Sequence, residues 1–137
     1  MKFLFICKAN VGRSQMAEAI FNSLTKVHVA SSAGLNPPTH WEGEKLSKTK
    51  HVAPCMLEIG INVSEKISKR LTEPMVKESD RVVVVGEKED WPIFLKEFVK
   101  LTYWDIVDPG DGDRELHITV RDQIREKVVG LVKELEK

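Results

Sequence analysis

The sequence predicts a three-layer α/β fold in which a four-stranded parallel sheet lies between helices on both faces. Short apolar segments alternate with helix-like segments along the chain. The segment RVVVV at 81–85 is so rich in valine that it suits a strand buried on both faces. Parallel strands are joined by crossovers that use helices, so both faces should be covered. The length of 137 residues suits one core, and we expect a single domain over 1–137.

The first predicted elements are a strand and an amphipathic helix. Residues 2–6 form an apolar run that ends at a polar loop, which is typical of a buried strand. A helix is expected from Arg13 to about Thr25, with Glu18 and Asn22 on the side opposite its apolar stripe. The apolar residues at helical spacing are Met16, Ala17, Ile20, Phe21 and Leu24.

The next segments continue this alternation. β-Branched residues predict a second strand at 27–33, and the Gly, Asn and Pro residues of GLNPP end it. A loop over 34–47 then leads to a helix through Cys55 to Glu58, which Gly60 terminates.

The second half should add two strands and three helices. Thr72 is a candidate N-cap for a short helix over 73–77, and the strand at 81–85 follows it. A helix is expected over 90–98 and a fourth strand over 99–106. The apolar stripe of a long final helix is formed by Val120, Ile124, Val128, Leu131 and Leu135.

Charge and composition exclude several classes of partner. Lys plus Arg equals Asp plus Glu at 21 each, so no global field draws the chain to nucleic acid or to a membrane. The opening MKFLFIC is too short for a signal-peptide core, which makes the cytoplasm the expected compartment. Cys7 and Cys55 match no zinc pattern, and neither a metal nor an organic cofactor is expected. Cys55 suits a small buried residue on a helix.

Two polar segments should meet at one edge of the sheet. Ligands of parallel α/β sheets bind beyond the carboxyl ends of the strands. Cys7 follows the first predicted strand and Asp108 follows the fourth. We therefore expect a site formed by these two distant segments.

The loop CKANVGRS, residues 7–14, is suited to hold an oxyanion. It joins a strand to a helix, so its backbone N–H groups and the helix N-terminus can surround an anion. Gly12 and Asn10 tolerate the unusual backbone angles of a tight loop. The predicted phosphate-binding residues are Lys8, Ala9, Asn10, Val11, Gly12, Arg13 and Ser14.

Cys7 and Arg13 carry the predicted chemistry. A helix N-terminus and a nearby arginine favour the thiolate, which is the nucleophilic form, and the Ser14 hydroxyl can donate a hydrogen bond to it. The planar Arg13 guanidinium can hold two oxygens of a tetrahedral oxyanion. Taken alone, the loop is equally consistent with a buried cysteine and a solvated arginine.

The segment CKANVGRSQMAEAIF resembles the opening of the low-molecular-weight protein tyrosine phosphatase and arsenate reductase superfamily, whose signature is Cys, five residues, Arg and Ser. Similarity continues in order through SAG, EIGINVS, SKRLTEPMV, RVVVV and WDIVDPGDGD. The resemblance implies a flavodoxin-like fold and the hydrolysis of phosphomonoesters through a phosphocysteine intermediate.

Asp108 is the predicted general acid. A carboxyl group must protonate the leaving oxygen and can then activate the water that cleaves the phosphocysteine. Asp108 stands before Pro109 and matches the place where the family keeps its acid. Asp111 ranks second, with Asp105 and Asp113 behind. The alternative for Asp111 and Asp113 is a turn that caps the last helix.

The sequence leaves the branch of the superfamily open. Tyrosine phosphatases usually carry aromatic residues after Asp-Pro, whereas this chain has Gly110 and Asp111, so Trp41, Tyr103 or Trp104 would have to supply an aromatic wall. Thioredoxin-coupled arsenate reductases use two further cysteines after the third strand, and VVVVGEKEDWP has none.

We therefore expect a phosphatase whose substrate is phosphotyrosine or an aryl phosphate. One alternative is an arsenate reductase that uses an external thiol or redoxin to reduce arsenate. The other is a phosphate-binding module without turnover.

Overall fold

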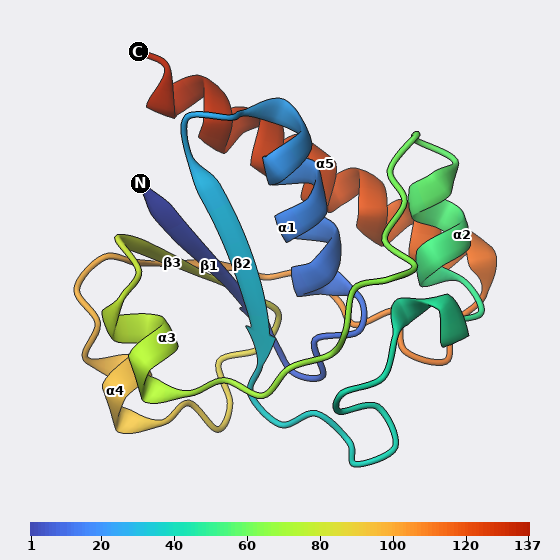
Figure 1. Cartoon of the computed structure of the whole chain (residues 1–137), viewed down its shortest axis with the longest axis horizontal. Helices are drawn as coiled ribbons and strands as arrows, with labels where there is room; N and C mark the ends of the chain where they lie inside the picture. Colours follow the sequence, from blue (N-terminus) through green and yellow to red (C-terminus); the bar gives the residue numbers. More distant parts are fainter.

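Four short strands form a parallel sheet in the order β2-β1-β3-β4, of which Figure 1 labels the first three. They are β1 (Lys2–Cys7), β2 (Val29–Gly34), β3 (Arg81–Val85) and β4 (Leu101–Trp104). The computed structural model describes all residues, 1–137. β1 and β3 lie at the centre, and the four valines of β3 are buried, as the density of valine predicts. The predicted sheet is confirmed.

Helices cover both faces of this sheet (Figure 1). One face is covered by α1 (Arg13–Leu24) and α5 (Arg114–Leu135), with α2 (Val52–Leu57) packed beside them. The other face is covered by α3 (Glu73–Lys77) and α4 (Ile93–Lys96), and a 3-10 helix, η1 (Leu46–Lys48), precedes α2. None of the helices has the length and apolar character needed to cross a membrane.

Alternate residues of β1 pack into opposite layers, as the two-residue period of a strand requires. Phe3 and Phe5 face α1, where their rings lie 4.8 Å and 5.8 Å from the ring of Phe21 between centroids. Leu4 and Ile6 belong to the smaller core on the side of α3 and α4. Both layers therefore pack on β1, which is buried from Phe3 to Cys7, and they fix the position of its C-terminal end, where the loop begins.

Three sequence predictions need correction. The helix expected over 90–98 is reduced to α4, because Pro92 restrains the residue before it and Asp90 has a left-handed φ of 61°. The strand expected over 99–106 is limited to β4, which pairs only with the short β3. Thr72 does occupy the N-cap position of α3, but its side chain makes no capping hydrogen bond.

Candidate active site

The loop between β1 and α1 forms the floor of the site. None of the backbone N–H groups from Lys8 to Gln15 donates a hydrogen bond within the chain, so these amides are available to an anion. Gly34 of the neighbouring strand permits the close approach of the loop, since a Cβ there would lie 2.9 Å from the carbonyl oxygen of Lys8. The loop thus presents free N–H groups where the sequence predicts an oxyanion cradle, and oxyanion binding itself stays a prediction.

Asn10 holds this loop in shape from inside. It is fully buried and has a left-handed φ of 57°, as the sequence predicts. Its amide nitrogen donates to the hydroxyls of Ser14 at 2.7 Å and Ser32 at 2.9 Å. Its amide oxygen accepts from Gln15 Nε2 at 3.0 Å and from the backbone N–H of Lys69 at 2.9 Å. All four hydrogen-bonding positions of the side chain are therefore used inside the protein.

The same amide determines the direction of the hydrogen bond to the thiol. Because Ser14 Oγ accepts from Asn10, its own hydrogen is free to be donated to Cys7 Sγ, which lies 2.9 Å away. A hydroxyl that donates to sulfur favours the thiolate form of Cys7. The predicted contact between Ser14 and Cys7 is present.

A buried polar chain continues beneath the loop and was missed in the sequence. Ser32 Oγ donates to Glu18 Oε1 at 2.8 Å, and Glu18 Oε2 pairs with the ammonium of Lys66. The sequence placed Glu18 opposite the apolar stripe of α1, which suggests an exposed position, but its side chain is only 7% exposed. The helical period was correct, and β2 together with the segment around Lys66 covers that side of the helix.

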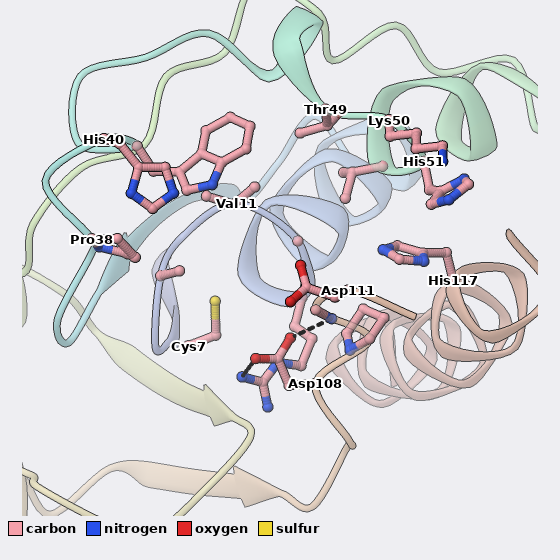
Figure 2. Close-up of a pocket in the computed structure, with 17 residues that line it drawn as sticks. Cys7, Val11, Pro38, His40, Thr49, Lys50, His51, Asp108, Asp111 and His117 are labelled. Atoms are coloured by element: carbon pink, nitrogen blue, oxygen red, sulfur yellow. Dashed lines mark hydrogen bonds and ion pairs between the residues drawn. The ribbon is translucent and has the colours of Figure 1, made fainter. Parts of the chain in front are cut away.

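Cys7 and Asp108 line one cavity of about 450 Å³ (Figure 2). Cys7 lies at the end of β1, and Asp108 follows β4. Their meeting confirms the expectation that two distant segments converge at the carboxyl edge of the sheet. Val11 and Gly12 of the loop line the same cavity, as does Trp41 from the long segment after β2.

Arg13 opens α1 beside the thiol, and its side chain is 2% exposed. It donates hydrogen bonds to Glu87 at 2.7 Å and 3.2 Å and to the carbonyl oxygen of Ile106 at 2.9 Å. Burial alone would lower the pKa of Arg13, but the hydrogen bond with Glu87 and the charge on Cys7 outweigh it, so the pKa is raised. The guanidinium therefore remains a fixed positive charge.

Asp108 lies at the rim of the cavity. Its side chain is 53% exposed, its Oδ1 accepts a 2.9 Å hydrogen bond from the backbone N–H of Gly110, and its Oδ2 lies 3.7 Å from Arg13 Nη2. This carboxyl group is thus oriented by the turn and reachable from the cavity.

The other three acidic candidates differ in position. Asp111 also lines the cavity, whereas Asp105 lines a separate groove beside α5. Asp113 is the N-cap of α5 and accepts a 2.9 Å hydrogen bond from the backbone N–H of Leu116. The capping alternative therefore holds for Asp113.

Of the three aromatic residues considered for a substrate wall, only Trp41 lines the cavity. Trp104 packs in the core against Phe5, with ring centroids 5.9 Å apart. The hydroxyl of Tyr103 donates to the carbonyl oxygen of Gly86. Tyr103 and Trp104 are therefore structural residues of β4.

The end of the cavity away from Cys7 carries two imidazoles (Figure 2). The rings of His51 and His117 lie 4.9 Å apart between centroids, and His117 Nδ1 donates to the carbonyl oxygen of Asp113 at 2.8 Å. Burial, followed by the positive charges of His117 and Lys50, lowers the pKa of His51. These side chains were not singled out in the sequence, because only the fold brings the start of α2 next to α5.

Cys55 lies on α2 and does not line the cavity. The residue is 1% exposed, its Sγ donates to the carbonyl oxygen of Val52 at 3.3 Å, and burial raises the pKa of its thiol. The geometry agrees with the predicted role as a small buried residue.

Comparisons with known proteins identify a family. Residues 2–137 match the family described as low molecular weight phosphotyrosine protein phosphatase. The chain is 29% identical to the protein-arginine-phosphatase of Bacillus subtilis (strain 168), over 100% of this chain and 98% of the relative. It is also 29% identical to the glutaredoxin arsenate reductase of Synechocystis sp., over 96% and 95%. A solved structure of a YwlE arginine phosphatase mutant with a phosphorylated active-site serine has a TM-score of 0.84 at 25% identity, with 100% and 97% covered.

Proposed function

Because the chain belongs to the low molecular weight phosphotyrosine protein phosphatase family, we propose that it hydrolyses phosphomonoesters through a phosphocysteine formed on Cys7. The observation that carries this proposal is the meeting of Cys7, Arg13 and Asp108 in one cavity above a loop of free backbone N–H groups. These are the parts that a two-step phosphoryl transfer needs, namely a nucleophile, an anion clamp and an acid.

The reaction follows from these positions. The Cys7 thiolate attacks phosphorus while the bond to the leaving oxygen breaks, and Asp108 supplies the proton that this oxygen takes up. The Asp108 carboxylate then removes a proton from water, the water oxygen attacks the phosphocysteine, and the sulfur leaves as thiolate. Throughout, the loop amides and Arg13 bind the oxygens of the phosphoryl group.

We propose an aryl phosphate, such as phosphotyrosine, as the substrate class. Val11, Trp41 and Pro109 provide apolar surface in a cavity of about 450 Å³, which is much larger than a phosphate group needs. The similarity to a protein-arginine-phosphatase adds phosphoarginine as a second candidate, for which Asp108 and Asp111 would offer negative charge to a guanidinium.

Arsenate reduction is the alternative activity, supported by the similarity to an arsenate reductase. The buried Cys55 lies outside the cavity, so it is a poor thiol to attack an arsenic adduct on Cys7. An external thiol would have to attack the sulfur of the Cys7–arsenic adduct, so that the S–As bond breaks, arsenite leaves and the two sulfurs are oxidised to a mixed disulfide. A second thiol would then reduce this disulfide and restore Cys7.

One set of assays tests these proposals. The purified chain is given para-nitrophenyl phosphate, a phosphotyrosine peptide and phosphoarginine, and separately arsenate with glutathione, glutaredoxin or thioredoxin. Turnover of the aryl substrates that exceeds phosphoarginine turnover supports the first proposal. Turnover of arsenate alone would show that the chain is an arsenate reductase and not a phosphatase. Binding of phosphate without any turnover would indicate a phosphate-binding module.

A further inference from the structure

The loop after β3 holds an acidic side chain that the proposed reaction does not use. Glu87 Oε2 accepts a 2.7 Å hydrogen bond from Arg13 Nη1, and its Oε1 accepts one of 3.2 Å from Nη2. The Arg13 side chain is 2% exposed, whereas that of Glu87 is 44% exposed. A half-exposed carboxylate therefore binds the buried guanidinium through two parallel hydrogen bonds.

The five N–H groups of Arg13 show which edge remains for an oxyanion. The two hydrogens of Nη1 go to Glu87 and to the carbonyl oxygen of Ile106. One hydrogen of Nη2 goes to Glu87, and Asp108 Oδ2, at 3.7 Å from Nη2, lies beyond hydrogen-bond reach. The Nε hydrogen and the second Nη2 hydrogen are left, and together they form the lateral edge of the guanidinium, which can bind two oxygens.

Three hydrogen bonds fix the backbone of Gly86 and Glu87. The N–H of Gly86 donates to the carbonyl oxygen of Trp104 at 2.9 Å, and the Tyr103 hydroxyl donates to the carbonyl oxygen of Gly86. Trp91 Nε1 donates to the carbonyl oxygen of Glu87 at 3.0 Å. The carboxylate thus extends from a fixed main chain.

Gly86 shows how closely this main chain approaches the guanidinium. Its φ is +147°, and a Cβ there would lie 2.5 Å from Arg13 Nη1. Glycine is required here because it adopts this positive φ without strain and has no Cβ to collide with the guanidinium. The end of β3 is therefore shaped around Arg13.

We propose that Glu87 is a positioning residue. It binds the end-on edge of the Arg13 guanidinium, formed by Nη1 and Nη2, so that the lateral edge faces the oxyanion bound above Cys7. This inference rests on the proposed phosphatase function. An oriented guanidinium matters most in the transition state, where it binds two oxygens of the transferring group at once. The negative charge of Glu87 also stands close to the anion site and opposes the binding of free phosphate. Glu87 should therefore raise kcat without tightening the binding of phosphate.

The substitution Glu87→Gln tests this, because it keeps the size of the side chain and removes its charge and one acceptor. We expect kcat for para-nitrophenyl phosphate to fall by about 10- to 100-fold, the cost of a misplaced catalytic group. The inhibition constant of inorganic phosphate should stay within about threefold or decrease. Unchanged kcat would overturn the proposal, as would parallel losses of kcat and phosphate affinity. Glu89→Gln, on the same loop without a contact to Arg13, is the matched control and should retain the wild-type kcat.

A double-mutant cycle separates positioning from a general structural role. In an Arg13→Lys background, which lacks both edges of the guanidinium, Glu87→Gln should change kcat by less than about threefold. An equal loss in both backgrounds would show that Glu87 does not act through Arg13.

A binding measurement decides the inference even if the proposed function fails. The Arg13 Nε–H resonance should shift when inorganic phosphate binds to the wild type, and in Glu87→Gln this resonance should be broadened with a smaller shift. An identical resonance and shift in both proteins would overturn the positioning role. Absence of all phosphatase activity in the wild type would instead overturn the proposed function alone.

Discussion

At the scale of single residues, the direction of one hydrogen bond connects the loop structure to the reactivity of the thiol. Asn10 donates to Ser14, which leaves the Ser14 hydrogen for Cys7. The proposed anion site consists of backbone N–H groups and Arg13, and neither depends on the sulfur atom. Chemical reactivity and anion binding can therefore be separated by mutation.

Cys7→Ser should abolish turnover and leave the binding of phosphate largely intact, because the loop amides and Arg13 are untouched. Turnover of para-nitrophenyl phosphate and calorimetric titration with inorganic phosphate measure the two effects. Cys55→Ser is the matched control and should change kcat by no more than a few-fold. Near-wild-type turnover in Cys7→Ser would refute the assignment of the nucleophile.

Asp108→Asn should slow the hydrolysis of phenyl phosphate by about 10²- to 10⁴-fold, the usual contribution of a positioned acid. The loss should be smaller for para-nitrophenyl phosphate, because an acidic phenol needs little protonation as it leaves. Asp111 lines the same cavity, so Asp111→Asn is the control, and we expect it to reduce the rate much less. A larger loss in Asp111→Asn, with the same dependence on the leaving group, would move the acid to Asp111.

At the scale of elements, the segment from β1 to α1 depends on contacts with two other parts of the chain. The Asn10 side chain joins the loop to Ser32 of β2 and to the main chain of Lys69. The conformation of the loop is therefore stabilised jointly by a local preference for the left-handed region and by tertiary hydrogen bonds.

Two substitutions separate these contributions. Asn10→Gly removes the buried hydrogen bonds and should lower the free energy of unfolding by about 1–3 kcal/mol. Asn10→Ala loses the same bonds and adds the strain of a left-handed φ, for a further loss of about 1–2 kcal/mol. Urea denaturation measures both. Equal stability of the two variants would show that the backbone angle relaxes without cost.

At the scale of the whole molecule, the packing of α2 beside α5 makes stability depend on pH. The pKa of His51 is lowered by burial and by the positive charges of His117, Lys50 and Arg114, while Asp113 acts in the opposite direction. The folded protein thus disfavours the charged imidazole, and the unfolded chain binds the proton more readily. The stabilisation is present above the ordinary pKa of about 6.5 and is lost as the pH falls below it.

His51→Gln should accordingly reduce the loss of stability between about pH 7.5 and about pH 5.5. The midpoint of urea denaturation at the two pH values is the measurement. His40→Gln, on the loop beside Trp41, provides the control and should leave the pH dependence as in the wild type. The interpretation fails if the two variants respond to pH in the same way.

The sequence alone was sufficient to predict the parallel sheet, the order of strands and helices along the chain, and the convergence of Cys7 with Asp108. Periodicity and the valine-rich strand report burial directly, and the carboxyl ends of parallel strands share one edge by geometry. The loop was also predictable, since its unusual backbone angle falls on Asn10, a residue that tolerates it.

Only the tertiary structure decided which polar groups act together. The buried Glu18 pairs with Lys66, which lies 48 positions away in the sequence, and Glu87 binds Arg13, which lies 74 positions away. No local sequence pattern encodes such contacts. Periodicity assigns each residue to a face of its own element. It does not say which other segment covers that face, because that depends on how the elements pack around the shared core.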